Sequence, residues 1–175
     1  MKRKSTRKKP PAKRVVAKKK VQPIPAGYHA ITPYLAVRGG AQAIEFYKKA
    51  FGAKELVRMP GPDGKLGHAE VQIGDSRVML SDEYEAMSFF GPQTRGGTTV
   101  LIHLYVKDVD ATVTRAVAAG GKVVRPLQDQ FYGDRTCSIE DPFGHLWYVA
   151  THTKDLSPAE IKRGAEQAAK KEAGG

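Results

Sequence analysis

The sequence predicts an α+β fold in which one small module occurs twice, each copy running strand, helix and then three strands. Two observations predict it. Stretches of strand-like and helix-like periodicity alternate in this order twice between residues 28 and 152. The second half also repeats the first after 69 positions, so that Leu35 and Ile44 fall on Leu104 and Val113. Such a repeat is too long for a solenoid unit, and it predicts two modules packed about a pseudo-twofold axis.

The first module, at about residues 28–83, begins with a strand-like stretch at 29–37. A helix is expected over 39–53, because apolar residues recur at helical spacing and Gly52 follows as a C-terminal breaker. The three remaining strands are expected at residues 55–60, 66–74 and 76–83. A loop rich in Gly, Pro and Thr, residues 84–98, leads to the second module.

The second module, at about residues 99–152, begins with a strand at 100–108. The helix that follows, at 108–121, has Asp108 or Asp110 near its N-cap. The last three strands are expected at residues 122–130, 132–141 and 145–152. The stretch DPFG between the last two strands is typical of a tight turn, since Pro follows Asp and Gly closes it.

The net charge of the chain lies in its first residues. The protein has 29 Lys or Arg and 18 Asp or Glu, and residues 1–20 hold eleven of the basic residues and no acidic one. The remaining residues carry equal numbers of each sign, so a basic surface on the folded part does not follow from the charge of +11. We expect residues 1–27 to be a disordered basic tail and linker, because they have few apolar residues to bury.

The other end of the chain, residues 153–175, is expected to form a helix and a short tail. Ser157, Pro158 and Glu160 have the spacing of an N-cap, a first-turn proline and a capping-box acid.

Several classes of protein are disfavoured by composition. The single cysteine, Cys137, excludes a disulfide framework, lies in an alternating strand-like stretch and is expected to be a buried structural thiol. Neither a secretory signal nor an apolar run long enough to span a membrane is found. We therefore expect a cytoplasmic protein that makes no membrane contact.

The motifs resemble those of the vicinal oxygen chelate superfamily, which contains glyoxalases, bleomycin-resistance proteins and ring-cleaving dioxygenases. The likeness covers about residues 28–152 and rests on PYLAVRGGAQAIEFYKKAFGA, GPDGKLGHAEVQIGD, VKDVDATVTRAVAAGG and YGDRTCSIEDPFGHLWYVATH. The HAE segment, the DPFGHxWxxATH ending and the Ser-Pro-Ala-Glu helix start further resemble the phosphonate-operon glyoxalase-like branch. The resemblance implies an eight-stranded half-open barrel with helices outside, a small-molecule pocket within it, and a homodimer.

The resemblance also implies where a metal would be held in many members, on His, Gln or Glu at the first and last strand of each module. In this sequence those positions fall on Thr32, Leu101, Tyr148 and either Met79 or Ser81. A divalent metal needs about three good N, O or S donors at ~2.0–2.5 Å, which this set does not supply. We therefore expect no cofactor at the family's positions. A displaced divalent-metal site formed by His68, Glu70 and His103 is the alternative.

The catalytic candidates are His68 and Glu70. They alternate with apolar residues along the expected strand 66–74, so both side chains lie on the face turned away from the helix. Neighbouring side chains on one face can pair as a general base and the carboxylate that orients it. The alternative interpretation is a pair of polar side chains that line a wet pocket.

Five residues of the second module are candidate ligand contacts: His103, Tyr105, Tyr132, Arg135 and Tyr148. His103 and Tyr105 lie two apart on one strand and share a face. Arg135 has two interpretations, because it can bind a ligand carboxylate or phosphate in a bidentate manner, or fix its loop by pairing with Asp134 or Asp129.

The function predicted from these observations is a glyoxalase-like small-molecule pocket protein without the usual metal site. It would be a binding or resistance-type protein, or an enzyme of unknown reaction. The first alternative is a metal-dependent lyase or isomerase of the glyoxalase type. The second is a nucleic-acid-associated protein that makes weak contacts with a polyanion through residues 1–20.

Overall fold

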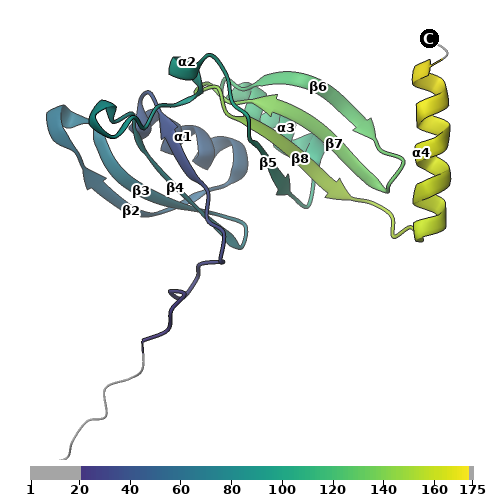
Figure 1. The fold of residues 1–175 in the computed structure, drawn as a ribbon, viewed down its shortest axis with the longest axis horizontal. Helices are drawn as coiled ribbons and strands as arrows, with labels where there is room; N and C mark the ends of the chain where they lie inside the picture. Colours follow the sequence, from purple (N-terminus) through teal and green to yellow (C-terminus); the bar gives the residue numbers. More distant parts are fainter. Residues whose placement is uncertain (1–20, 174–175) are drawn as a thin grey trace, which may run out of the picture.

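The computed structural model describes residues 21–173, and the basic stretch 1–20 lies outside the described residues. The predicted α+β fold is confirmed: strand, helix and three strands occur in this order twice (Figure 1). No helix among the described residues is long and apolar enough to cross a membrane.

Module one begins with β1 and α1, and its elements are β1 (Tyr34–Val37), α1 (Gly40–Phe51), β2 (Lys54–Pro60), β3 (Leu66–Ile73) and β4 (Ser76–Asp82). Module two repeats the order with β5 (Leu101–Tyr105), α3 (Val109–Ala118), β6 (Lys122–Asp129), β7 (Asp134–Glu140) and β8 (Leu146–His152). Short helical turns η1 (Pro62–Gly64), η2 (Glu85–Met87) and α2 (Pro92–Arg95) lie in the connections, and α4 (Pro158–Ala173) ends the described chain. The stretch expected to be a plain loop, 84–98, therefore contains η2 and α2.

The strands form two open four-stranded sheets, in the orders β1-β4-β3-β2 and β5-β8-β7-β6, consistent with a half-open barrel. The first and last strand of each module are parallel neighbours. Tyr34 pairs with Met79 in one sheet and His103 pairs with Tyr148 in the other. Both members of the second pair lie 69 residues beyond those of the first, so the repeat seen in the sequence also sets the register of the two sheets.

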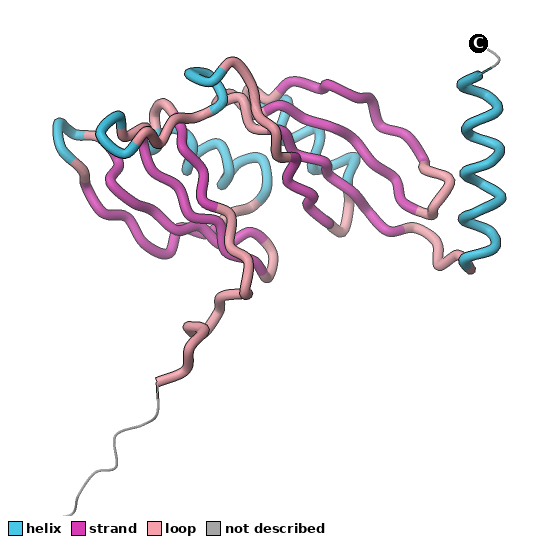
Figure 2. The backbone as a smooth tube through the Cα atoms, viewed as in Figure 1, coloured by secondary structure: helices cyan, strands magenta, loops and turns pink. Residues whose placement is uncertain are grey.

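The two modules share one hydrophobic core. Helix α1 packs on the first sheet, α3 packs on the second, and the two helices contact each other (Figure 2). Phe51 of α1 packs on Trp147 of β8 with their ring centroids 4.6 Å apart, and Trp147 is 1% exposed. Trp147 therefore lies on the helix side of its strand.

The DPFG turn contains a buried acid that explains its composition. Asp141 is 2% exposed, and its Oδ1 accepts from the backbone N–H groups of Phe143 and His145 at 2.9 Å each. Its Oδ2 accepts from the Tyr47 hydroxyl and the Trp147 indole N–H, also at 2.9 Å each. The carboxylate thus closes the turn and ties α1 of module one to β8 of module two.

The helix ends show which capping predictions hold. Asp108 accepts from the Ala111 N–H at 2.9 Å, so it is the N-cap of α3, while Asp110 has another partner. In α4 the capping box is formed: Glu160 accepts from the Ser157 N–H at 2.8 Å. The first strand is shorter than expected, because β1 begins only after Pro33, which has no N–H to donate to a ladder.

Candidate functional site

A chain of polar side chains crosses the open face of module one. The Tyr34 hydroxyl lies 2.9 Å from His68 Nδ1, and His68 Nε2 lies 3.4 Å from Glu70 Oε1. Arg77 then donates to Glu70 Oε2 at 2.9 Å. The two catalytic candidates are therefore neighbours, as the sequence predicts, and they are linked to two partners that sequence reasoning missed.

The register of the sheet places these side chains together. His68 and Glu70 alternate with Ala69 and Val71, which are fully buried in the core. Arg77 of β4 lies opposite Gln72 of β3, which is two residues from Glu70 and on the same face. The long side chain of Arg77 therefore reaches the Glu70 carboxylate. Tyr34 could have been found from the sequence. It lies two residues after Thr32, the position at which the resemblance places a metal ligand, and alternate residues of an extended segment point to the same side.

The segment before β1 closes over this network. The Arg77 guanidinium lies 4.1 Å from the centre of the Tyr28 ring and donates to the Ala26 carbonyl at 3.3 Å. Hydrogen bonding from Tyr28 is the largest cause that lowers the pKa of Glu70, with His68 and Arg77 acting in the same direction and burial opposing them. The Glu70 carboxylate is therefore anionic at neutral pH.

A cavity of about 810 Å³ adjoins the network at one end of module one. Its wall includes the rings of Tyr34, Tyr84 and Phe89 and the side chain of Met87. Tyr84 and Phe89 form an isolated two-residue bridge, in which the Tyr84 N–H donates to the Phe89 carbonyl at 2.9 Å. The Tyr34 and Phe89 rings meet edge to face with their centroids 5.3 Å apart, so Tyr34 belongs both to the cavity and to the polar network.

Two of the three acidic residues in the cavity wall are already engaged in hydrogen bonds, and the third, Asp63, is exposed in η1. Asp82 accepts from the N–H groups of Gly39 at 2.7 Å, Gly40 at 2.9 Å and Leu66 at 2.7 Å, and so caps α1 from a distant strand. Glu83 accepts from the Gly91 N–H, the Thr94 hydroxyl and Arg38. Both carboxylates therefore serve the fold, and the cavity presents mainly apolar surface.

Module two gathers four of the five predicted ligand contacts on its open face. The His103 ring stacks on Tyr105 with centroids 4.6 Å apart and meets Tyr148 edge-on at 5.1 Å. The Tyr132 and Tyr148 hydroxyls lie 2.9 Å apart. Burial is the largest cause that raises the pKa of Tyr132, so this phenol stays protonated at neutral pH.

A buried carboxylate, which the sequence analysis named only as a possible partner of Arg135, lies beside this cluster. Asp134 is 3% exposed and accepts from the Tyr105 hydroxyl at 2.8 Å. His152 Nδ1 lies 2.7 Å from the other carboxylate oxygen of Asp134, and His152 Nε2 lies 3.0 Å from Asp155. The imidazole thus bridges the end of β8 and the segment that leads to α4.

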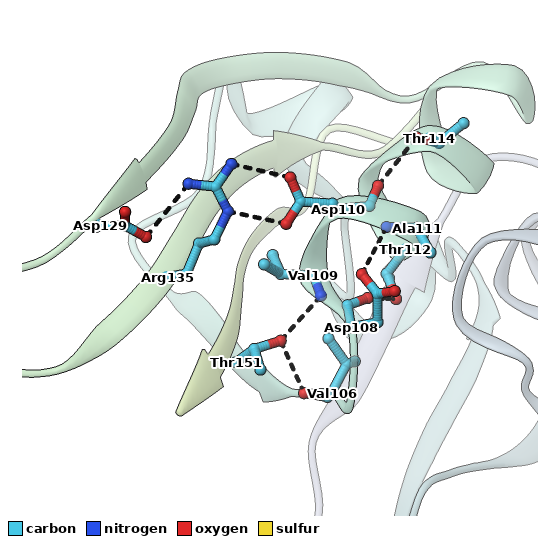
Figure 3. Close-up of polar contacts among 10 residues, drawn as sticks. All are labelled: Val106, Asp108, Val109, Asp110, Ala111, Thr112, Thr114, Asp129, Arg135 and Thr151. Carbon is cyan, nitrogen blue, oxygen red and sulfur yellow. Dashed lines mark hydrogen bonds and ion pairs between the residues drawn. The ribbon is translucent and has the colours of Figure 1, made fainter. Parts of the chain in front are cut away.

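The fifth candidate, Arg135, lies on the opposite face of β7, which carries α3 (Figure 3). Its guanidinium binds both carboxylate oxygens of Asp110, at 2.8 and 2.9 Å, and also contacts Asp129 at 3.2 Å. The hydrogen bonds with Asp110 are the largest cause that raises the pKa of Arg135. Of its two predicted roles, the structure shows pairing with Asp129 and attachment of α3, and it does not bring Arg135 to the tyrosines.

The displaced metal set is not gathered within one chain. His68 and Glu70 belong to the first sheet and His103 to the edge strand of the second. Among residues 21–173, no group of three or more His, Cys, Asp or Glu side chains is placed to hold a metal ion. In the parallel pairs, two of the family's positions, Met79 and Tyr148, lie opposite Tyr34 and His103, and a third, Leu101, lies opposite Leu146. Leucine has no donor atom, so these three positions do not supply a three-donor set.

Comparison with known proteins places the chain in a family. Residues 28–149 match the model of the Glyoxalase/Bleomycin resistance protein/Dioxygenase superfamily. The chain belongs to this superfamily. It is 47% identical, over 136 residues, to the uncharacterised protein Mb0911c of Mycobacterium bovis, a match covering 76% of this chain and 90% of the relative.

Several solved structures are similar to this chain in fold. TioX from Micromonospora sp. ML1 is 31% identical with a TM-score of 0.57, covering 70% of this chain and 97% of TioX. A PhnB protein from Bacillus cereus has a TM-score of 0.56 and covers 70% of this chain and 99% of that protein. At 16% identity it shows likeness of fold alone. The superfamily assignment made from the sequence motifs is therefore confirmed.

Proposed function

We propose that this superfamily member binds a small, largely apolar molecule in the cavity of module one. The observation that carries the proposal is the double role of Tyr34. Its ring forms part of the 810 Å³ cavity with Phe89, and its hydroxyl contacts His68. A cavity of this volume, apolar with a few polar groups at one side, is typical of a small-molecule site.

A fluorescent probe tests this proposal. The neutral dye N-phenyl-1-naphthylamine is expected to bind the full chain with enhanced emission. The variant Met87→Asp places a charge in the wall of the cavity and should weaken dye binding by about tenfold, because one buried apolar contact is worth ~1.5 kcal/mol or more. Met59→Asp is the matched control, since Met59 is an exposed methionine of β2 that lies outside the cavity. Equal affinity for both variants would contradict the proposal.

A second candidate function is proton transfer to or from the bound molecule. It is favoured by the chain Tyr34–His68–Glu70, in which an anionic carboxylate orients an imidazole that contacts a phenol at the cavity. Tyr34→Phe separates the two functions, because it keeps the ring and removes the hydroxyl. Dye affinity should stay within about twofold, whereas turnover of an enzyme using this relay should fall by about 10²-fold.

We further propose that the protein works without a metal at the family's positions and forms a homodimer. Poor donor chemistry at those positions supports the first point. The homodimer is supported by open edges: β1 and β5 each have a neighbour on one side only, and Leu101 and Tyr105 of β5 are 48% and 61% exposed.

Residues 1–20 are proposed to add a weak polyanion contact that weakens steeply with salt.

A further inference from the structure

A second hollow, separate from the cavity of module one, lies between α4 and the strands β6 and β7. Its volume is about 600 Å³, and Tyr148, Thr136 and Ser138 of the open face of module two are among its lining residues. Residues of β6 and α4 complete its lining. Helix α4 lies beyond residues 28–149, the segment that matches the superfamily model.

Helix α4 approaches Phe131 closely at a glycine. A Cβ added to Gly164 would lie 3.0 Å from the Phe131 Cβ and 3.2 Å from its Cδ2, so a larger residue would push the helix away. Glycine in a helix interior is otherwise destabilising relative to Ala. Its presence here is explained by close approach to the loop after β6, where Figure 1 shows α4 at the end of the sheet.

The lining of this groove has an excess of hydrogen-bond donors. Arg125 of β6 and Lys171 of α4 both line it, and neither forms an ion pair with a carboxylate among the side chains that the structure describes. The one carboxylate in the lining, Asp129, binds Arg135 at 3.2 Å. The amides of Gln128 and Gln167 also line the groove without a hydrogen-bond partner among the described residues.

The floor of the groove combines apolar surface with hydrogen-bonded hydroxyls. The Phe131 ring is 41% exposed, and Tyr148 donates to Thr136 Oγ1 at 3.0 Å. Gln130 donates to the same Thr136 oxygen at 2.8 Å. The lining is mainly polar, and the Phe131 ring supplies an apolar patch, which fits an organic anion with one aromatic ring system.

We propose that the groove between α4 and β6–β7 binds a small organic anion, with Arg125 and Lys171 contacting its carboxylate, phosphate or sulfonate group. The site is distinct from the module-one cavity and does not depend on the function proposed for that cavity. Guanidinium and ammonium groups that line one groove favour anions over neutral molecules of equal shape.

The test is a titration of the ¹⁵N-labelled full chain with 2-naphthoate at about 150 mM salt, where long-range attraction to the basic residues is screened. We expect backbone amide signals of Gln128 and Gln167 to shift. The neutral analogue 2-naphthalenemethanol should leave them unchanged. Shifts at Phe89 report the module-one cavity instead, so the two proposals fail or succeed separately.

Two variants define the site. The double variant Arg125→Gln/Lys171→Gln should lower the affinity for 2-naphthoate, as measured from the amide shifts, at least about tenfold. This is the effect expected for loss of charge-assisted hydrogen bonds. Arg163→Gln/Lys170→Gln removes the same charge from exposed positions of α4 outside the groove, and should change the affinity by less than about twofold. Equal weakening by both double variants, or equal shifts by the neutral analogue, would overturn the proposal.

The role of α4 as a wall is tested by Gly164→Leu. Leucine favours a helix more than glycine does, so the variant should keep α4 helical while displacing it from Phe131. We expect loss of the naphthoate-induced shifts at Gln128. Unchanged binding in this variant would show that α4 is not part of the site.

Discussion

At the scale of single residues, three acids illustrate how burial and partners decide a role. Asp141, Asp82 and Asp134 all look like surface residues by type, but each accepts hydrogen bonds from several donors. Asp141 and Asp134 are 2% and 3% exposed. A buried carboxylate is tolerated only with such partners, because its desolvation cost is otherwise several kcal/mol.

Asp141→Asn is predicted to destabilise the protein by about 2–3 kcal/mol, since an amide nitrogen would face the donors Tyr47 or Trp147 and leave a buried N–H without an acceptor. Urea denaturation followed by tryptophan fluorescence measures the change. Asp75→Asn on an exposed turn is the control and should shift stability by less than ~0.5 kcal/mol. Equal effects of the two substitutions would show that the DPFG turn does not depend on its carboxylate.

At the scale of elements, the junction between β8 and α4 is controlled by His152. The hydrogen bond with Asp134 is the largest cause that raises its pKa, followed by the one with Asp155, while burial opposes them. Protonated His152 donates to both carboxylates at once. The stabilisation is therefore complete below the ordinary histidine pKa of about 6.5, and it is lost as the pH rises through the higher pKa of the folded state.

His152→Gln is accordingly expected to lower the melting temperature at pH 6 and to have a smaller effect at pH 8.5. Among the described residues, the Tyr105 hydroxyl is the only other hydrogen-bond partner of the Asp134 carboxylate. It stays protonated in this range, because the hydrogen bond with Asp134 raises the pKa of Tyr105. Thermal denaturation of both proteins at the two pH values measures the difference. An equal decrease in melting temperature at both pH values would mean that the charge of His152 does not stabilise the junction.

At the scale of the whole molecule, the two modules are joined through their helices, while their open faces carry separate groups. The core runs from α1 through Phe51 and Trp147 into the second sheet. The open faces carry the Tyr34–His68–Glu70 chain on module one and the His103–Tyr148 cluster on module two. This arrangement leaves β1 and β5 as free edges, which is the basis for the proposed homodimer.

Native mass spectrometry of the untagged full chain tests the homodimer and the metal together. We expect a mass of twice 19.1 kDa with no added mass from a stoichiometric divalent metal. Leu101→Lys is expected to shift the population towards the monomer, because it places a charge on the exposed edge of β5. A monomer at micromolar concentration, or one metal ion per chain, would refute the corresponding proposal.

The sequence by itself determined the order of the elements, the two-module repeat and the placement of His68 and Glu70 on one face of a strand. These features follow from periodicities of 2 and 3.6 residues and from turn and cap motifs, which are local properties. Asp108 and Ser157 could be read as caps for the same reason.

Only the tertiary structure decided which distant groups meet. Asp82 caps α1 across 43 positions, Tyr34 reaches His68 across 34, and Arg135 turns to Asp110 and not to the tyrosines. These contacts depend on strand register and on which face of a sheet a helix covers. The sequence alone does not specify them, because each Arg has several acidic residues as possible partners. The groove under α4 has the same origin, because it exists only where the helix approaches Phe131.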